Sequence, residues 1–165
     1  MLRKMYLVPV VAMLALPALA CAQFEAGNWS LEVAGQGSND KDFHDGSVAL
    51  QGNLGYFLSK EFEVGVRQGI SYVGTPGGHA WNGQTQGAAD FHFDLDRWQP
   101  YVGGNIGYSY GESVNDTWIA GPEVGVKYFV NSTTFVDLMA SYEFDLNNGI
   151  DHGGFLYSLA LGFRW

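Results

Sequence analysis

The sequence predicts an all-β protein: an eight-stranded antiparallel transmembrane up-and-down β-barrel, preceded by a cleavable signal peptide. Two observations lead to this fold class. Apolar residues alternate with small or polar residues along repeated segments, as in strands that have one apolar face and one polar face. The final residues, 157–165, continue this alternation and end on an aromatic side chain, which is typical of the closing strand of a membrane barrel.

Residues 1–22 have the pattern of a secretory signal peptide. Arg3 and Lys4 precede a short apolar stretch, and Ala20-Cys21-Ala22 offers a cleavage site between small residues. Cleavage there leaves residues 23–165, which we expect to form a single barrel domain. No segment approaches the roughly 20 consecutive apolar residues of a membrane helix, so strands must make any crossing.

Cys21 is the only cysteine, so the chain cannot form an internal disulfide. Two fates are open for it. It leaves with the signal peptide, or it is the lipidated cysteine of a lipoprotein signal. Leu19, directly before the small residue Ala20, fits a lipoprotein signal poorly, so we favour removal.

The composition excludes one class of partner. The chain has 8 basic and 17 acidic residues, and loss of Arg3 and Lys4 would leave 6 basic residues and a net charge of −11. Nucleic-acid phosphates would repel such a chain, so no nucleic-acid partner is expected. The 23 glycines and 15% aromatic residues argue against a disordered acidic segment and favour curved strands with aromatic belts.

Eight segments alternate with period two, and each has about the 9–11 residues that cross a bilayer with tilt. An even number of strands places both mature termini on the periplasmic side. The expected strands are 28–37, 47–58, 61–73, 84–95, 98–110, 117–130, 133–146 and 154–165.

The connections are expected to alternate between short and long, as in outer-membrane barrels. The short, periplasmic ones are 59–60, 96–97 and 131–132. The long, external ones are rich in Gly, Asn and Asp and cover 38–46, 74–83, 111–116 and 147–153.

The alternation assigns an apolar face to lipid and a polar face to the lumen. A soluble β-sandwich or a lipocalin-like barrel would instead pack the apolar faces inward. The charged residues of the opposite face would then lie on the outer surface. In an eight-stranded barrel they fill the interior, where each must be paired. The expected lumen network is Glu32, Glu63, Arg67, Asp90, Glu123, Lys127, Asp137 and Arg164.

Within this network we predict two ion pairs between neighbouring strands, Lys127–Asp137 and Arg67–Asp90. Arg164 is expected near Glu32, because the last strand should pair with the first. The network is interpreted as the polar core of the barrel. The alternative is a narrow gated path for ions or water.

One strand carries a more specific pattern. Trp98-Gln99-Pro100-Tyr101-Val102-Gly103-Gly104-Asn105-Ile106-Gly107-Tyr108 resembles the W-x-P-Y-V-G-x-x-x-G-Y strand of small outer-membrane barrels of the OmpA/OmpX type. Pro100 suits the start of a strand, and Tyr101 is expected at the membrane interface. The resemblance implies a location in the Gram-negative-type outer membrane. No peptidoglycan-binding domain is expected, since the chain ends at the barrel.

The same resemblance gives the last strand a role in assembly. It implies that the terminal aromatic strand is a signal read by the barrel insertion machinery. The residues on its lipid-facing side are Tyr157, Leu159, Leu161, Phe163 and Trp165.

We find no pattern for catalysis. A barrel hydrolase needs a serine beside a histidine and a carboxylate. His44, His92 and His152 are not part of a His-x-Ser pair, and the chain lacks the Asp-Ser dipeptide that resemblance to lipid A palmitoyltransferases would require. No enzyme activity and no cofactor are expected.

Metal ligands are also poorly arranged. Asp40, Asp42 and Asp45 resemble a calcium loop only superficially. His44 and His79 belong to different expected loops, as does His152. No metal site is expected, although acidic loops could collect divalent cations that bridge lipopolysaccharide phosphates.

The sequence therefore favours a monomeric, non-enzymatic outer-membrane barrel with a structural or surface-interaction role. Its partners would be outer-membrane lipids, lipopolysaccharide and the insertion machinery. The first alternative is porin-like transport of ions or small solutes through a narrow channel. The second is a lipid-modifying enzyme.

Overall fold

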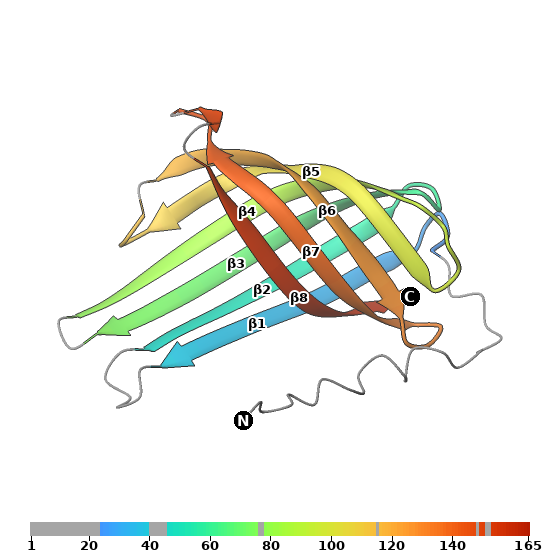
Figure 1. The fold of residues 1–165 in the computed structure, drawn as a ribbon, viewed down its shortest axis with the longest axis horizontal. Coiled ribbons are helices and arrows are strands. Elements are labelled where there is room, and N and C mark those ends of the chain that lie inside the picture. The colour runs from blue at the N-terminus through green and yellow to red at the C-terminus, as the bar shows by residue number, and fades with distance from the viewer. Residues whose placement is uncertain (1–23, 40–45, 76–77, 115, 148, 151–152) are drawn as a thin grey trace, which may run out of the picture.

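The computed structural model describes residues 24–39, 46–75, 78–114, 116–147, 149–150 and 153–165. Its strands form a closed barrel in chain order, each antiparallel to its neighbours, which confirms the predicted fold class (Figure 1). The strands are β1 (Trp29–Asn39), β2 (Gly46–Phe57), β3 (Phe62–Thr75), β4 (Gly78–His92), β5 (Trp98–Gly111), β6 (Thr117–Phe129), β7 (Thr134–Asp145) and β8 (Gly153–Arg164).

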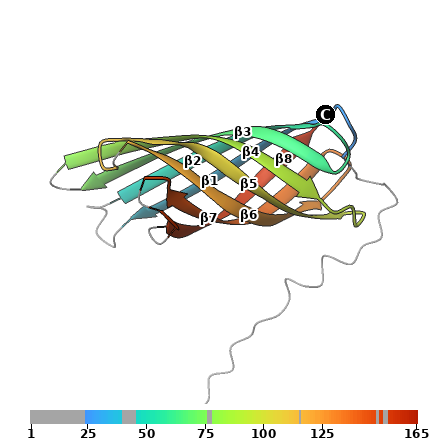
Figure 2. The same ribbon diagram turned by 90° about the horizontal axis from the view of Figure 1, so that it is seen from above.

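The barrel has two ends, which we name by their connections. The turn end carries residues 58–61, 93–97 and 130–133, together with the segment before β1 and Trp165. At the loop end β1 is followed by β2, β3 by β4, β5 by β6 and β7 by β8. The strands run obliquely between the two ends (Figure 2). At the turn end the amides of Trp29 and Trp165 each donate to the other's carbonyl oxygen, at 3.0 and 3.1 Å.

One predicted loop is wrong. Residues 74–83 were expected to form a long connection, but β3 continues to Thr75 and β4 begins at Gly78. The Gly and Asn residues of this stretch suggested a loop, yet His79 and Asn82 pair with Gly74 and Ser71 in a regular antiparallel ladder. The regular alternation of short and long connections therefore fails at 76–77.

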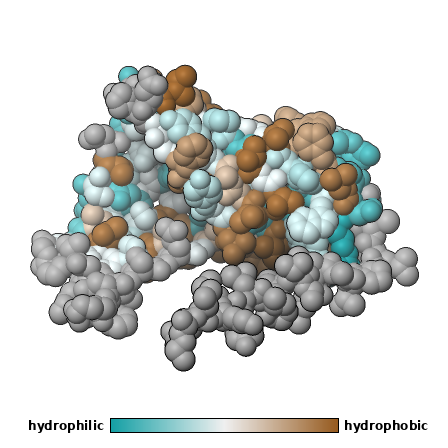
Figure 3. Space-filling model, in the orientation of Figure 1, coloured by the Kyte–Doolittle hydropathy of each residue, from teal (hydrophilic) through white to brown (hydrophobic). Residues whose placement is uncertain are grey.

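The two faces of the sheet follow the predicted alternation. Val33, Leu50 and Val66 are 52%, 61% and 60% exposed on the outer surface. Apolar side chains gather on the visible outer face in Figure 3. The expected inward carboxylates and bases are buried, apart from Arg164, which is half-buried. Among the residues that the structure describes, no helix is long and apolar enough to span a membrane.

The ladder between β6 and β7 has a gap beside Pro122. It contains Ala120↔Phe144 and Glu123↔Ser141 but no pair between them. Proline has no amide hydrogen to donate, which accounts for the interruption. At the same point a Cβ on Gly121 would overlap the carbonyl of Tyr142, so the close approach of the two strands requires glycine here.

Candidate functional site: a barrel interior in two parts

Four buried phenylalanines fill the interior at the turn end. Phe24, from the segment before β1, stacks on Phe57 with the ring centroids 3.8 Å apart. Phe129 and Phe135 meet the Phe24 ring edge-on, at 5.0 and 5.6 Å. None of the four is more than 1% exposed. We call Phe24, Phe57, Phe129 and Phe135 the aromatic plug, because they close the lumen at this end.

A buried lysine lies directly next to the plug. Lys127 Nζ lies 2.7 Å from Glu32 Oε1 and 2.6 Å from Glu63 Oε2. It also lies over the rings of Phe24 and Phe135, at 5.4 and 5.3 Å from their centroids. Two carboxylates and several ring faces together balance one ammonium group that has no access to water.

The predicted ion pair between Lys127 and Asp137 is wrong. Lys127 and Asp137 are register partners on β6 and β7. The ammonium group nevertheless makes its ion pairs across the lumen with Glu32 and Glu63. Asp137 accepts a hydrogen bond from the Tyr101 hydroxyl at 3.0 Å. A long side chain in a narrow barrel can reach beyond its neighbouring strand.

Tyr101 itself is a correction to the sequence prediction. It was expected at the membrane interface, but its side chain lies inside the barrel, 3% exposed, with its hydroxyl on Asp137. Its position two residues before Gly103 and four before Asn105 puts it on the same inward face as those residues.

Glu63 gathers a serine and a histidine. Ser30 Oγ donates to Glu63 Oε1 at 2.5 Å, and His92 Nε2 lies 3.0 Å from Glu63 Oε2. The carboxylate thus sits between the two other groups. An activated serine requires the histidine next to the hydroxyl, so this arrangement does not form a nucleophilic triad. All three residues are buried, and the His92 ring lies 5.1 Å from the Phe57 ring of the aromatic plug.

The second ion pair lies nearer the middle of the barrel. Arg67 donates to both carboxylate oxygens of Glu123, each at 3.0 Å, and Asn105 Nδ2 donates to Glu123 Oε2 at 2.5 Å. Such two-pronged contacts are among the stronger charged hydrogen bonds.

The predicted Arg67–Asp90 pair is wrong. The β3–β4 register places Gln86 opposite Arg67, while Asp90 is opposite Glu63, four residues nearer the turn end. Arg67 therefore extends across the lumen to β6 and pairs with Glu123. Asp90 remains in the interior, 5% exposed.

Amide side chains continue the network toward the loop end. Gln86 Nε2 donates to Asn105 Oδ1 at 3.1 Å and to Glu143 Oε1 at 2.8 Å. Gln84 Nε2 donates to Glu143 Oε2 at 2.7 Å. These amide side chains extend the Arg67–Glu123 group toward the loop end.

Arg164 occupies the rim of the turn end. Its Nε donates to the carbonyl of Ser132 at 2.7 Å, and its NH1 donates to Asn28 Oδ1 at 2.9 Å. Its guanidinium carbon lies 5.7 Å from the centroid of the Phe129 ring. Glu32, its predicted partner, pairs with Lys127 further inside.

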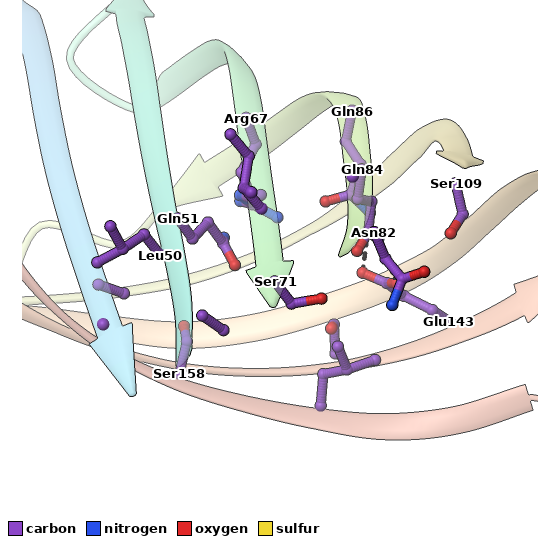
Figure 4. A pocket seen from close by; sticks show the side chains of 18 of the residues that line it. Leu50, Gln51, Arg67, Ser71, Asn82, Gln84, Gln86, Ser109, Glu143 and Ser158 are labelled. Carbon is purple, nitrogen blue, oxygen red and sulfur yellow. Dashed lines mark hydrogen bonds between the residues drawn. The ribbon is translucent and has the colours of Figure 1, made fainter. Parts of the chain in front are cut away.

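The interior toward the loop end is hollow. A cavity of about 560 Å³ is lined by polar side chains that include Gln51, Arg67, Gln84 and Glu143. Figure 4 shows these side chains projecting from several strands around one space, with Ser158 on β8 at its side. The interior therefore has a solid half at the turn end and a hollow half toward the loop end, so the expectation that side chains fill the interior is correct only at the turn end.

The lipid-facing side of the last strand also follows the prediction in its geometry. Each of its five residues is at least 45% exposed on the outer surface. These residues are Tyr157, Leu159, Leu161, Phe163 and Trp165.

The sequence interpretation missed the aromatic plug. Its signal was present, since Phe57, Phe129 and Phe135 lie two residues from Gly55, Lys127 and Asp137 and so share their inward face. Phe24 gives no such signal, because it lies before the first strand and its position depends on how the chain turns into the barrel.

Metal ligands do not gather in the part of the chain that the structure describes, where no three His, Cys, Asp or Glu side chains lie together in a metal-binding group. Asp40, Asp42 and Asp45 lie outside the described residues, as do His44 and His152.

Comparison with solved structures identifies the architecture. The outer membrane protein OprG from Pseudomonas aeruginosa is similar over 88% of this chain and 99% of its own, with a TM-score of 0.63 and 11% identity. The N-terminal β-barrel domain of Pseudomonas aeruginosa OprF is similar over 85% and 98%, with a TM-score of 0.59 and 17% identity. The fold is that of the small eight-stranded outer-membrane barrels.

A third similar structure is Ail from Yersinia pestis in a phospholipid bilayer nanodisc. It covers 84% of this chain and 99% of its own, with a TM-score of 0.57 and 12% identity. No protein-family model matches the chain, and no curated protein matches it. The shared property is thus the barrel itself.

Proposed function

We propose that this protein is an integral outer-membrane barrel with a structural or surface-interaction role, without enzymatic activity and without a conducting pore. The location is supported by the eight-stranded fold, which it shares with outer-membrane proteins, and by the exposed apolar outer face. Soluble monomers rarely expose so many apolar side chains together, whereas a bilayer requires them.

The single observation behind the absence of a pore is the Lys127 centre beneath the aromatic plug. Lys127 is fully enclosed by Glu32, Glu63 and the rings of Phe24 and Phe135. Passage of an ion or solute would require these paired charges to separate inside the protein, which is costly. This opposes the porin-like alternative.

The proposed location in the outer membrane determines which partners the barrel would contact. The outer face would contact membrane lipids and lipopolysaccharide. The closing strand, with Phe163 and Trp165 at its end, would be read by the barrel insertion machinery. Both termini of the mature chain would be periplasmic, with the loop end external, and the barrel would act as a monomer after removal of residues 1–22.

Two measurements on one preparation test the proposal. A folded membrane barrel resists detergent, so unheated and boiled samples should migrate differently on a detergent gel. The same unheated protein, inserted into planar bilayers, should give no stable unitary current steps. Identical migration before and after boiling would contradict the membrane barrel, while reproducible current steps would contradict the closed lumen.

A further inference from the structure

The seam between the first and last strands closes only in its half near the turn end. The β1–β8 register runs from Ser30↔Arg164 to Ala34↔Ala160 and stops there. Yet β1 continues to Asn39, and β8 begins at Gly153. Figure 1 shows the two strands diverging toward the loop end.

The hollow half of the interior reaches this open seam. The cavity of about 560 Å³ is lined by Ala34 and Gly35 of β1 and by Ser158 and Leu159 of β8. Leu50 of the adjoining strand also lines it, although that side chain belongs to the exposed outer face. The cavity therefore extends from the polar lumen to the apolar surface of the barrel.

Backbone groups along an open seam need partners if the seam lies in lipid. Past Ala34↔Ala160 the facing edges of β1 and β8 have no ladder pairs with each other among the described residues. Bilayer hydrocarbon offers no hydrogen bonds to unpaired amide and carbonyl groups. An occupant with hydrogen-bonding groups at one end and hydrocarbon at the other would satisfy both the edges and the surrounding lipid.

The lumen side of the cavity defines the polar end of that occupant. Ser141 lines the cavity, is 2% exposed, and its hydroxyl has no hydrogen-bond partner within the described protein. Asn53 Oδ1 is likewise unpartnered and lines a small cavity that shares Gln51, Ala34 and Ser158 with the larger one. Both groups lack a partner that a ligand could supply.

Charge selects an uncharged head group. Arg67 is the basic side chain in the described lining, and its charge is balanced by the two-pronged ion pair with Glu123. The other charged lining residue is Glu143, which accepts from Gln84 and Gln86. An anionic head would meet a carboxylate without a spare cation, whereas hydroxyl groups could bond to serine and amide side chains.

We propose that this cavity, which we call the seam pocket, binds an uncharged single-chain amphiphile from the bilayer. Its hydroxyl-bearing head lies between the unpaired edges of β1 and β8 and reaches the lumen near Ser141, and its acyl chain lies on the outer face beside Leu50 and Leu159. This rests on the proposed membrane location. The volume is within the ~300–1,000 Å³ range of small-molecule sites.

The binding test uses a monolauroylglycerol with a photoreactive diazirine on its acyl chain, added to the protein in phosphatidylcholine nanodiscs. Labelling should be saturable and confined to peptides of the seam, near Gly35, Leu50 and Leu159. Ser141→Leu, which fills the pocket, should reduce labelling at least tenfold. Ser132→Leu, on the exposed connection between β6 and β7, should leave it unchanged.

Competition separates head-group chemistry from simple lipophilicity. Unlabelled monolauroylglycerol should displace the probe at least tenfold better than laurate, which has the same chain and an anionic head. Even labelling around the barrel, or equal labelling of the Ser141→Leu variant, would overturn the proposal. Each variant is first checked for heat-modifiable migration, whose loss would instead contradict the membrane barrel.

A disulfide test examines the seam directly, in a Cys21→Ala background. Leu31→Cys with Phe163→Cys lies in the paired half and should oxidise readily. Gly35→Cys with Leu159→Cys would be the next pair if the ladder continued, and should oxidise at least tenfold more slowly. Equal rates would mean a closed seam, and dimers formed by Gly35→Cys alone would mean that a second copy covers it; either result overturns the proposal.

Discussion

Lys127 and Glu63 form an ion pair of 2.6 Å in the barrel interior, with each side chain 2% exposed. Glu32 contacts the same ammonium group from β1, so three strands converge on one lysine. Because the surrounding plug excludes water, neither carboxylate has an alternative solvent shell. This arrangement makes the lysine the central charge of the turn end.

Replacing that lysine should therefore be severe. Lys127→Met leaves Glu32 and Glu63 buried without a cation, and we expect a loss of about 3–5 kcal/mol in the free energy of unfolding. Urea titration in detergent micelles, followed by tryptophan fluorescence, measures it. Lys60→Met is the matched control, since the Lys60–Glu61 pair is exposed and should contribute less than about 1 kcal/mol. Similar losses in the two variants would contradict the role of the buried centre.

The sequence predicted the barrel well and its interior only in part. Period-two alternation depends on backbone geometry alone, so the faces of Val33, Leu50 and Glu123 could be assigned without knowing any partner. The ion-pair partner of an inward side chain depends on the strand register and on the length of that side chain. Arg67 illustrates this. Its register partner on β4 is Gln86, four residues from Asp90, and its ion-pair partner Glu123 lies across the lumen.

The Arg67–Glu123 pair predicts a contrast between single and double variants. Arg67→Met leaves the Glu123 carboxylate without its two-pronged partner and should cost about 3–5 kcal/mol. Arg67→Met combined with Glu123→Leu removes both charges and should recover at least half of that loss. The same urea titration provides the values. If the double variant were no more stable than Arg67→Met, the loss would not come from the unpaired Glu123 carboxylate.

The aromatic plug should be a major source of packing stability. Phe24→Ala removes the ring that stacks on Phe57 and contacts Phe129 and Phe135, and we expect a loss of about 3–5 kcal/mol. Phe62→Ala removes an equal ring from the outer face near the same end, where Phe62 is exposed. Its loss in detergent should be clearly smaller. Equal losses would mean that Phe24 does not fill the lumen in the folded protein.

Gly121 should tolerate no side chain where β6 meets β7. A Cβ there would overlap the Tyr142 carbonyl, a backbone group that cannot rotate away, so Gly121→Ala should cost about 1–3 kcal/mol. At Gly52 the nearest atom to an added Cβ is 4.0 Å away, so Gly52→Ala should change stability little. Thermal unfolding in detergent compares the two variants. A neutral Gly121→Ala would show that the strands can separate at the Pro122 gap.

Trp165 should matter for insertion more than for stability. Its backbone is joined to Trp29 by two hydrogen bonds, and its side chain is 61% exposed on the outer face. Trp165→Ala keeps those bonds and removes only the ring, so the free energy of unfolding should change by no more than about 0.5–1 kcal/mol.

If the insertion machinery reads this ring, the amount of heat-modifiable barrel in the outer membrane should fall several-fold in cells that express Trp165→Ala. Refolding of the same variant into detergent should remain normal. Trp118→Ala removes a similarly exposed indole from the start of β6, at the loop end, and should leave insertion unchanged. Equal amounts of Trp165→Ala and unaltered barrel in the membrane would refute the signal. Equal loss for both tryptophan variants would instead indicate a general need for interfacial aromatic residues.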